Sequence, residues 1–377
     1  RIGIECRSIE DKNNLWGVGK MILGLLEELS HRPELEKDFR FILYFKDTIS
    51  NYSFLNSPIF EKKIVPVPFL KGRLFPIYYF ALLPMKLWFE RLDWMFWPNY
   101  MLPIIAFNKS MVMLTEDVYY ETRGGQLPFR YRLAYGIFAW WTAKFANKIL
   151  AISETSKKNI SKLYKINLER IFVNYLGIDS PKLTSLQAYQ LTSLPAYQLT
   201  SYILYVGQMF PRRHAKEVLL AYEKIVSEYP NLDFIMIGPD KYPMPIINKM
   251  ANEINKKNGR EAVIHKDHVS DEELAQLYEY AKVLVYVSDR EAFGLPPMEA
   301  LSHGLPPIIA DNELGHELFK DHAIYTRGAS PTDIYEAIRQ TLTDSDKINQ
   351  IKSTGPEFVK KYNWKDFTDK FLAILDK

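Results

Sequence analysis

The sequence predicts an α/β protein of two domains, each built on a parallel β-sheet with helices on both faces. Short apolar runs bounded by polar loops alternate with segments of helical periodicity along most of the chain. This alternation starts at residues 1–6 and starts again at residues 202–206. The length of 377 residues also exceeds what a single hydrophobic core usually supports.

The first domain is expected at residues 1–180. Strands are expected at apolar runs between polar loops, at residues 1–6, 39–45, 63–66, 111–114, 148–152 and 171–174. Helices are expected at residues 18–29, 130–145 and 154–164, where apolar side chains recur at helical spacing. Ser153 is the expected N-cap of the last of these helices. The aromatic stretches between residues 66 and 111 are also expected to be helical.

Residues 181–201 interrupt the alternation. They contain an uncharged eight-residue repeat, LTSLQAYQ-LTSLPAYQ-LTS. A period of eight fits neither a helical supercoil nor a known solenoid repeat. We interpret this segment as an interdomain linker.

The second domain is expected at residues 202–360. Its strands are expected at residues 202–206, 234–237, 262–265, 283–287 and 307–310, and its helices at 216–228, 245–258 and 271–281, from 298 and from 331 onward. Residues 361–377 contain an amphipathic helix, which we expect to return to the first domain.

Composition excludes several classes of protein. The net charge of +3 is too small, and the basic residues too scattered, for a nucleic-acid partner. The single cysteine, Cys6, rules out a disulfide framework and suits a reducing compartment. No zinc-type spacing of Cys and His occurs, so no metal site is predicted. With no signal peptide before the strand-like run at residues 1–6, we expect a cytoplasmic location.

Two glutamates, Glu291 and Glu299, lie on either side of the turn that contains Gly294. A buried strand precedes the turn and a helix is expected from Met298, so Glu291 lies where ligands of open α/β sheets bind. Free N–H groups at the helix start favour an anion such as a phosphate. Glu299 is expected in the first turn of that helix, where a carboxylate taken alone more often only complements the helix dipole.

Residues 291–306, EAFGLPPMEALSHGLP, resemble the E-x7-E signature EGFGLPxxEAxxxGxP of retaining glycosyltransferases of the GT4 family. The resemblance implies the GT-B fold, in which two Rossmann-like, doubly wound domains face an interdomain cleft. It also implies that Glu291 orients the donor sugar and that Glu299 accepts hydrogen bonds from the ribose. The backbone amides of Phe293, Gly294 and Leu295 would contact the sugar and the phosphates.

Arg212 and Arg213 follow the first strand of the second domain, in a segment that resembles the family's diphosphate loop, VGxxxPRKN. Two guanidinium groups before a helix can clamp a diphosphate and stabilise the charge of a leaving nucleotide. Arg213 and His214 replace the lysine and asparagine of the family. The alternative interpretation is that Arg212 and Arg213 are solvated basic residues without a functional role.

The first domain has two further matches. Gly17 and Gly19 resemble the family's amino-terminal glycine loop, where a backbone without side chains can approach a phosphate or sugar closely. Asp117 matches an aspartate near the acceptor, but Glu116 replaces the family's histidine beside the donor sugar. This departure from the family pattern affects either the specificity for the sugar or the reaction that is catalysed.

The resemblance implies a metal-independent, retaining transferase. It would move a hexose-type sugar from a UDP- or GDP-linked donor, with no other cofactor, to a glycan or lipid-linked acceptor in bacterial-type polysaccharide synthesis. Two routes can retain the configuration of the anomeric carbon, double displacement and front-face attack, and the sequence leaves both open. Two other functions stay open: a non-catalytic subunit that binds nucleotide sugars, and a GT-B enzyme that cleaves or isomerises them.

Aromatic and basic residues are interleaved over residues 68–106 and 130–148. Trp and Tyr suit a membrane interface, and Lys and Arg suit anionic headgroups, so these segments predict peripheral attachment at the inner face of a membrane. An aromatic core with solvated charges explains the pattern equally well. The apolar part is too short for a spanning helix.

Overall fold

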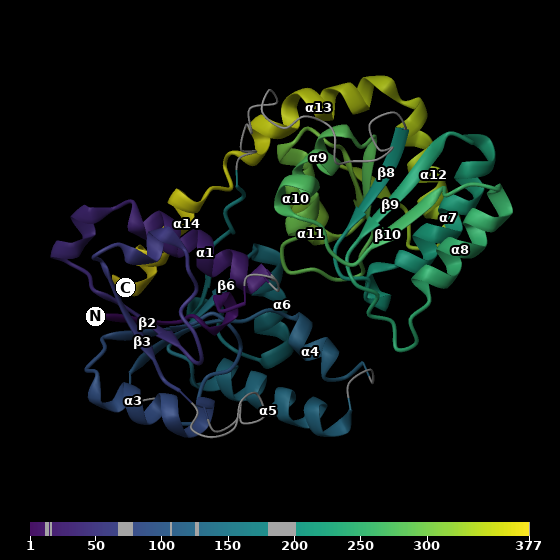
Figure 1. Ribbon diagram of the computed structural model, residues 1–377. Helices are drawn as coiled ribbons and strands as arrows, with labels where there is room; N and C mark the ends of the chain where they lie inside the picture. Colours follow the sequence, from purple (N-terminus) through teal and green to yellow (C-terminus); the bar gives the residue numbers. More distant parts are fainter. Residues whose placement is uncertain are drawn as a thin grey trace. The chain divides into compact units, whose positions relative to one another are not determined.

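The computed structural model describes residues 1–376 except 12–14, 16, 67–77, 106–107, 125–127 and 180–200. It forms two compact units, Arg1–Gly177 with Tyr362–Lys377 and Ile178–Lys361, called here the first and second domains (Figure 1). Both are doubly wound, Rossmann-like α/β domains, as the sequence predicts. Of the predicted linker at 181–201, all but Ser201 lies outside the described residues.

The first domain is organised by a parallel sheet in which β1 is central. Its strands are β1 (Ile2–Glu5), β2 (Phe41–Phe45), β3 (Phe60–Ile64), β4 (Trp94–Trp97), β5 (Lys109–Met113), β6 (Lys148–Ala151) and β7 (Ile171–Val173). They follow the order β3-β2-β1-β4-β5-β6-β7. Ile2 is paired with Phe41 on one side and with Trp94 on the other, so the winding direction reverses between β1 and β4.

Helices cover both faces of this sheet. They are α1 (Gly17–Ser30), α3 (Leu83–Phe89), α4 (Asp117–Glu121), α5 (Phe129–Phe145), α6 (Glu154–Tyr164) and α14 (Trp364–Asp376), with short helical turns η1 (Arg7–Ile9), η3 (Pro33–Lys37), η4 (Ser53–Asn56), η5 (Tyr78–Leu82) and η6 (Leu168–Arg170). Ser153 caps α6 as predicted, because its side chain accepts a hydrogen bond from the Ser156 N–H at 3.0 Å.

The second domain repeats the plan with a parallel sheet in the order β10-β9-β8-β11-β12-β13. Its strands are β8 (Ser201–Val206), β9 (Leu232–Ile237), β10 (Val263–Lys266), β11 (Val283–Tyr286), β12 (Pro307–Ala310) and β13 (Ile324–Thr326). Its helices are η7 (Pro211–Arg213), α7 (Ala215–Glu228), α8 (Ile247–Asn258), α9 (Asp271–Tyr280), α10 (Leu295–Ser302), α11 (Glu313–Phe319), α12 (Pro331–Thr343) and α13 (Ser345–Val359). The winding reverses between β8 and β11.

Several elements differ from the sequence-based prediction. The strand expected at 63–66 lies at Phe60–Ile64, and β4 falls within a stretch expected to be helical. The four residues of β4 are all large and apolar, and such a short run has no periodicity that separates a strand from a helix. The prediction also missed α11 and β13, which are short and follow polar residues.

The carboxyl-terminal helix α14 packs on the first domain, against α1. The Trp364 ring lies so close to Gly24 that a Cβ there would be 2.3 Å from it, which explains a glycine inside α1. Phe371 meets Phe96 of β4 edge to face, with 5.0 Å between ring centroids. The Lys148 ammonium donates a buried hydrogen bond to the Ile374 carbonyl. These contacts make α14 part of the core of the first domain.

The first prediction concerns this packing. Because Phe371 is fully buried, Phe371→Ala should lower the free energy of unfolding of the first domain by about 3–5 kcal/mol, through lost apolar burial and the cavity left behind. Urea denaturation followed by tryptophan fluorescence measures the change. Lys370→Ala, on the exposed side of the same helix, is the control and should leave the midpoint nearly unchanged.

Candidate functional site

The two loops that leave β8 and β11 are neighbours, because these strands pair in parallel, with Ile203 opposite Val283. The strand order reverses between them. Ligands of open α/β sheets bind at the carboxyl ends of strands at such a reversal. The first loop carries Arg212 and Arg213, and the second carries Glu291. The fold therefore brings together residues that are far apart in the sequence.

An ion pair joins these loops. The Arg213 Nε donates to Glu291 Oε1 at 2.6 Å, and Nη2 donates to Glu291 Oε2 at 3.0 Å. The Arg213 and Glu291 side chains are only 15% and 14% exposed. Ser288 Oγ donates to Glu291 Oε1 at 3.1 Å, and Arg213 Nη1 donates to the Gln208 carbonyl at 3.1 Å. Such a two-point contact fixes the position and the plane of both groups.

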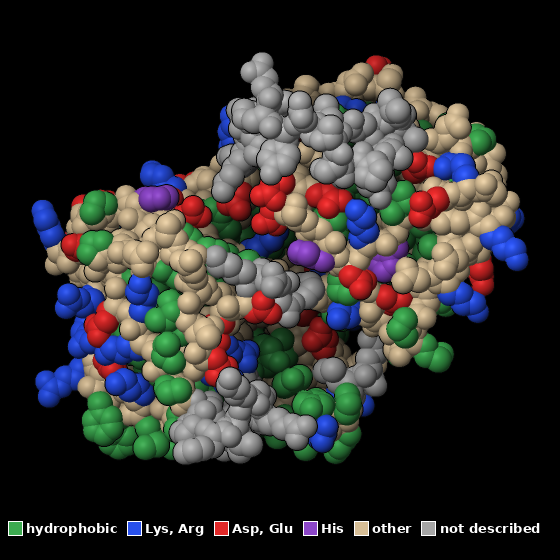
Figure 2. Space-filling model, in the orientation of Figure 1, with side chains coloured by type: hydrophobic (Ala, Val, Ile, Leu, Met, Phe, Trp, Pro, Cys, Tyr) green, Lys and Arg blue, Asp and Glu red, His purple; other side chains and the backbone are tan. Residues whose placement is uncertain are grey.

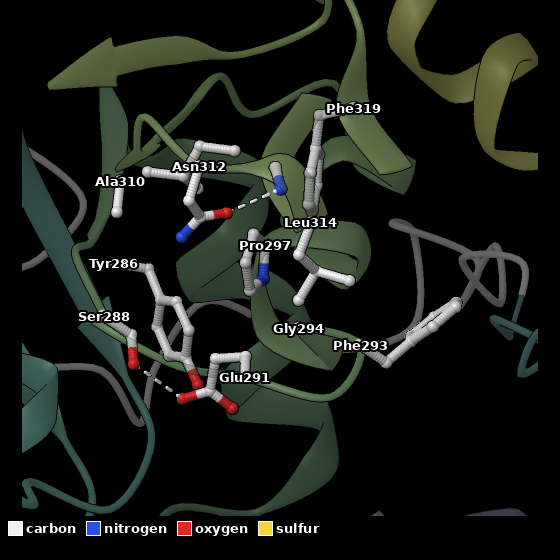
Figure 3. Close-up of a pocket in the computed structure, with 12 residues that line it drawn as sticks. Tyr286, Ser288, Glu291, Phe293, Gly294, Pro297, Ala310, Asn312, Leu314 and Phe319 are labelled. Carbon is white, nitrogen blue, oxygen red and sulfur yellow. Dashed lines mark hydrogen bonds between the residues drawn. The ribbon is translucent and has the colours of Figure 1, made fainter. Parts of the chain in front are cut away.

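Tyr286 of β11 completes this cluster. The Arg213 guanidinium lies 5.3 Å from the centre of the Tyr286 ring, and the hydroxyl end of Tyr286 points toward Glu291 (Figure 3). Burial raises the pKa of the Tyr286 hydroxyl well above its usual value. Burial alone would lower the pKa of Arg213, but Tyr286 and Glu291 outweigh that effect and raise it. Arg213 is therefore permanently charged.

Glu291 forms part of the wall of a hollow that is open to solvent (Figure 3). The hollow is lined by residues of β11, β12, α10, α11 and their loops: Tyr286, Ser288, Glu291, Phe293, Gly294, Pro297, Ile309, Ala310, Asn312, Leu314, Gly315 and Phe319. Asn312 caps α11 by accepting a hydrogen bond from the Gly315 N–H at 2.8 Å. The hollow thus combines a fixed carboxylate, polar groups and an apolar wall.

Helix α10 begins three residues earlier than predicted, at Leu295. Gly294 precedes it with φ of +87°, a conformation that a side chain would strain, and two prolines occupy the first turn, where they need no N–H partner. Glu299 therefore lies in the second turn and not in the first. The amino-terminal end of α10, including Gly294 and Phe293, faces the hollow.

The Glu299 carboxylate is oriented by α9. The Tyr278 hydroxyl donates to Glu299 Oε2 at 3.1 Å. Burial, followed by the nearby charge of Glu299, raises the pKa of Tyr278 well above its usual value, so this hydroxyl keeps its proton. On its other side Tyr278 stacks on His303, with 5.6 Å between ring centroids. Glu299 is half-buried.

Arg212 and His214 flank the ion pair. The Arg212 guanidinium lies 4.7 Å from the centre of the Phe210 ring, and the Arg212 carbonyl accepts from the Asp289 N–H at 2.9 Å. His214 Nε2 lies 2.6 Å from Asp289 Oδ1, and its backbone is left-handed, with φ of +49°. Asparagine tolerates that conformation well, which explains the residue type in the resembled pattern.

The predicted residues of the first domain occupy two helix starts. Gly17 opens α1 and is exposed, whereas Gly19 is buried and a Cβ there would lie 2.9 Å from the Ser8 carbonyl oxygen. Packing alone therefore requires a glycine at position 19. Asp117 is the first residue of α4.

Glu116 is buried and has a structural role. Only 3% of its surface is exposed, and its carboxylate accepts hydrogen bonds from Ser156 Oγ and from Asn159 Nδ2, the latter at 3.1 Å. Both donors belong to α6, so Glu116 ties the start of α4 to that helix. A residue held in this way does not need the properties of the histidine that it replaces in the resembled pattern.

Comparison with known proteins bears on the family and on the fold. Residues 193–358 match the family described as "Glycosyl transferases group 1". The match covers most of the second domain and less than half of the chain. The serotype-specific mannosyltransferase WbdA of Escherichia coli is 30% identical over 173 residues, 45% of this chain and 20% of WbdA. The O-antigen chain mannosyltransferase RfbU of Salmonella typhimurium is 27% identical over 62% of this chain and 61% of RfbU.

The chain thus spans about a fifth of WbdA and three fifths of RfbU. Among solved structures, Anabaena Alr3699/HepE in complex with UDP-glucose is similar over 100% of this chain and 99% of its own, with a TM-score of 0.70 and 15% identity. This likeness supports the GT-B fold.

Metal-binding clusters and membrane-spanning helices are both absent from the residues that the structure describes. In those ranges, no group of three or more His, Cys, Asp or Glu side chains is placed to hold a metal ion. None of the helices in the same ranges combines the length and the apolar character needed to span a bilayer.

Sequence reasoning missed three polar or aromatic residues of the second domain that line the hollow: Tyr286, Ser288 and Asn312. Asn312 had a usable signal, because an Asn before Glu-Leu at the end of a strand is a common helix N-cap. Tyr286 had none, since within its strand it reads as one more apolar residue.

The second prediction tests the ion pair. Arg213→Met should lower the free energy of unfolding of the second domain by about 3 kcal/mol, because it leaves the Glu291 carboxylate without its counter-charge. Arg213→Met/Glu291→Leu should recover most of this loss. Urea denaturation measures both.

Lys257→Met is the matched control, since it removes an exposed pair with Glu223 that should contribute less than about 1 kcal/mol. A loss for Arg213→Met as small as that of the control would contradict the role given to the pair.

The third prediction concerns pH. The carboxylates of Glu217, 3.6 Å from His214 Nδ1, and of Asp289 outweigh burial and raise the pKa of His214 above its usual 6.5. The stabilisation by protonated His214 is thus complete below about pH 6.5 and is lost as pH rises through the folded-state pKa. His214→Asn, which tolerates the left-handed backbone, should abolish this part of the pH dependence. If the free energy of unfolding changes with pH in the same way for His214→Asn and for the wild type between pH 5.5 and 8.5, the prediction is wrong.

Proposed function

We propose that this protein is a retaining glycosyltransferase that moves a hexose-type sugar from a UDP- or GDP-linked donor to an acceptor hydroxyl. The observation that carries the proposal is Glu291, held by Arg213 at the wall of a hollow where the winding of the sheet reverses. The group 1 family and the two mannosyltransferases support it. A glycan or lipid-linked acceptor in bacterial polysaccharide synthesis fits these relatives.

The donor occupies the hollow in this proposal. The N–H groups around Phe293, Gly294 and Leu295, at the start of α10, point their partial positive charge at the diphosphate. Glu299 accepts hydrogen bonds from the ribose hydroxyls, with Tyr278 orienting its carboxylate. These contacts are to parts of the donor that do not react, and they place the anomeric carbon beside Glu291.

The leaving group is stabilised by the positive charge of the β8–α7 loop. Arg212 contacts the departing diphosphate, while Arg213 acts through Glu291, because its Nε and Nη2 both donate to that carboxylate. Fixed cationic groups and helix dipoles stabilise developing negative charge without reorganisation. This is the electrostatic work that a metal ion performs in other transferases, and we propose that the reaction needs none.

The pairing of Glu291 favours the front-face route. Double displacement needs a carboxylate free to attack the anomeric carbon. Each oxygen of Glu291 instead accepts a charge-assisted hydrogen bond from Arg213, which lowers its nucleophilicity. In the front-face route the leaving phosphate takes the proton of the acceptor hydroxyl, and Glu291 only orients the sugar. In the first domain, Asp117 is proposed to contact the acceptor, and the backbone at Gly17 and Gly19 is proposed to approach a phosphate or sugar of the donor.

The fourth prediction tests this function. A thermal-shift panel of UDP-, GDP- and ADP-sugars should identify one donor that raises the melting temperature, because a ligand at a hundred times its Kd stabilises the native state by about 2.7 kcal/mol. With that donor, Glu299→Gln should weaken binding, and Glu291→Gln should lower the transfer rate more than tenfold. EDTA should leave transfer unchanged.

Glu279→Gln, an exposed carboxylate on α9, is the matched control and should behave as wild type. Full transfer rates in both Glu291→Gln and Glu299→Gln would overturn the site. Donor consumption without an acceptor would instead indicate a cleaving or isomerising enzyme. Tight donor binding without any turnover would indicate a non-catalytic subunit.

A further inference from the structure

Large apolar side chains are exposed mainly in one part of the first domain. Among the described residues, sixteen large hydrophobic side chains are exposed, and eleven of them lie between residues 85 and 145. The second domain contributes two, Met244 and Tyr280. Such an accumulation on one region, unlike scattered single residues, marks an interaction surface. Figure 2 shows hydrophobic side chains along the edge of the first domain where Figure 1 draws α3 and α5.

Helix α5 carries a row of large apolar residues on its outer side. Phe129, Leu133, Ile137 and Trp140 are each more than half exposed and follow one another at intervals of four, four and three residues. At about 100° per residue this spacing makes one continuous stripe, roughly 16 Å long. The fully buried residues on the side that packs on the domain are small, namely Ala139, Thr142 and Ala143, and Phe138 and Trp141 pack partly buried against the same core. Packing of the domain therefore leaves the stripe unused.

Helix α3 adds to the same surface. Its Leu83 and Leu87 belong to the core cluster that also contains Ala143 of α5, so both helices cover the same side of the sheet. Their outer sides consequently face away from it together. On α3 the outer residues are Met85, Trp88 and Phe89, again each more than half exposed. We call these three residues and the four of the α5 stripe the outer face.

The charges beside the outer face are positive. Arg130 and Lys144 lie on the same side of α5 as the stripe, Lys86 lies on α3 beside Met85, and α5 contains no acidic residue. Glu90, after α3, is buried and paired with Lys63 and Lys86. Protein interfaces are depleted in lysine, whereas helices that lie in a membrane interface combine Trp, Phe and Leu with Lys and Arg.

We propose that the outer face docks this protein on a bilayer surface that contains anionic phospholipids. The aromatic and aliphatic side chains enter the boundary between headgroups and acyl chains, with α3 and α5 lying in the plane of the membrane. Arg130 and Lys144 contact the lipid phosphates. The proposal is independent of the transfer reaction, because it requires neither donor nor acceptor.

Co-sedimentation of the full chain with vesicles tests it. The protein should bind vesicles of phosphatidylglycerol mixed with phosphatidylcholine, and bind much less to phosphatidylcholine alone. Arg130→Gln/Lys144→Gln should lower the partition coefficient for the anionic vesicles about 25-fold, since each basic residue near such a surface contributes about fivefold. Leu133→Glu/Ile137→Glu should abolish binding to both kinds of vesicle.

Met244→Glu/Tyr280→Glu is the matched control, because it places the same charges at exposed apolar positions of the second domain, and it should bind as wild type. Melting temperatures establish that each variant is folded; Arg130 and Lys144 are exposed, so their variant keeps the test informative if the Glu variant unfolds. Absence of binding to anionic vesicles would overturn the proposal. So would a wild-type dimer in solution that Leu133→Glu/Ile137→Glu converts to a monomer without changing vesicle binding, because the outer face would then contact a second copy.

Discussion

The bidentate ion pair between Arg213 and Glu291 is the interaction on which the second domain's site depends. It ties the loop after β8 to the loop after β11, the two strands between which the winding reverses. Because both groups are mostly buried, each needs the other as a counter-charge. The pair therefore couples the geometry of the hollow to the stability of the domain.

The pair also changes the interpretation of its two members. A lone loop carboxylate is a candidate nucleophile, and a lone arginine is a candidate phosphate ligand. Joined at two points, Glu291 becomes an acceptor with fixed orientation, and Arg213 becomes the group that holds it. In the proposed function, positive charge for a diphosphate then comes mainly from Arg212 and from the amino-terminal end of α10.

Acidic residues in the two domains show how burial decides a role. Glu116 and Glu291 both follow strands of a parallel sheet, and both are held by hydrogen bonds. Glu116 is enclosed by Ser156 and Asn159 and fixes one helix to another, whereas Glu291 borders a hollow that is open to solvent. The same contrast between inner and outer sides separates the small buried residues of α5 from its exposed aromatic stripe.

The sequence alone determined the two α/β domains and the loops that carry candidate residues, because strand and helix periodicity and turn residues are local properties. It did not determine that β4 is a strand, since four large apolar residues suit either element. It also could not show that Arg213 meets Glu291, 78 positions away, or that Glu116 is enclosed by α6. Those contacts depend on which strands and helices become neighbours, and only the tertiary structure decides that order.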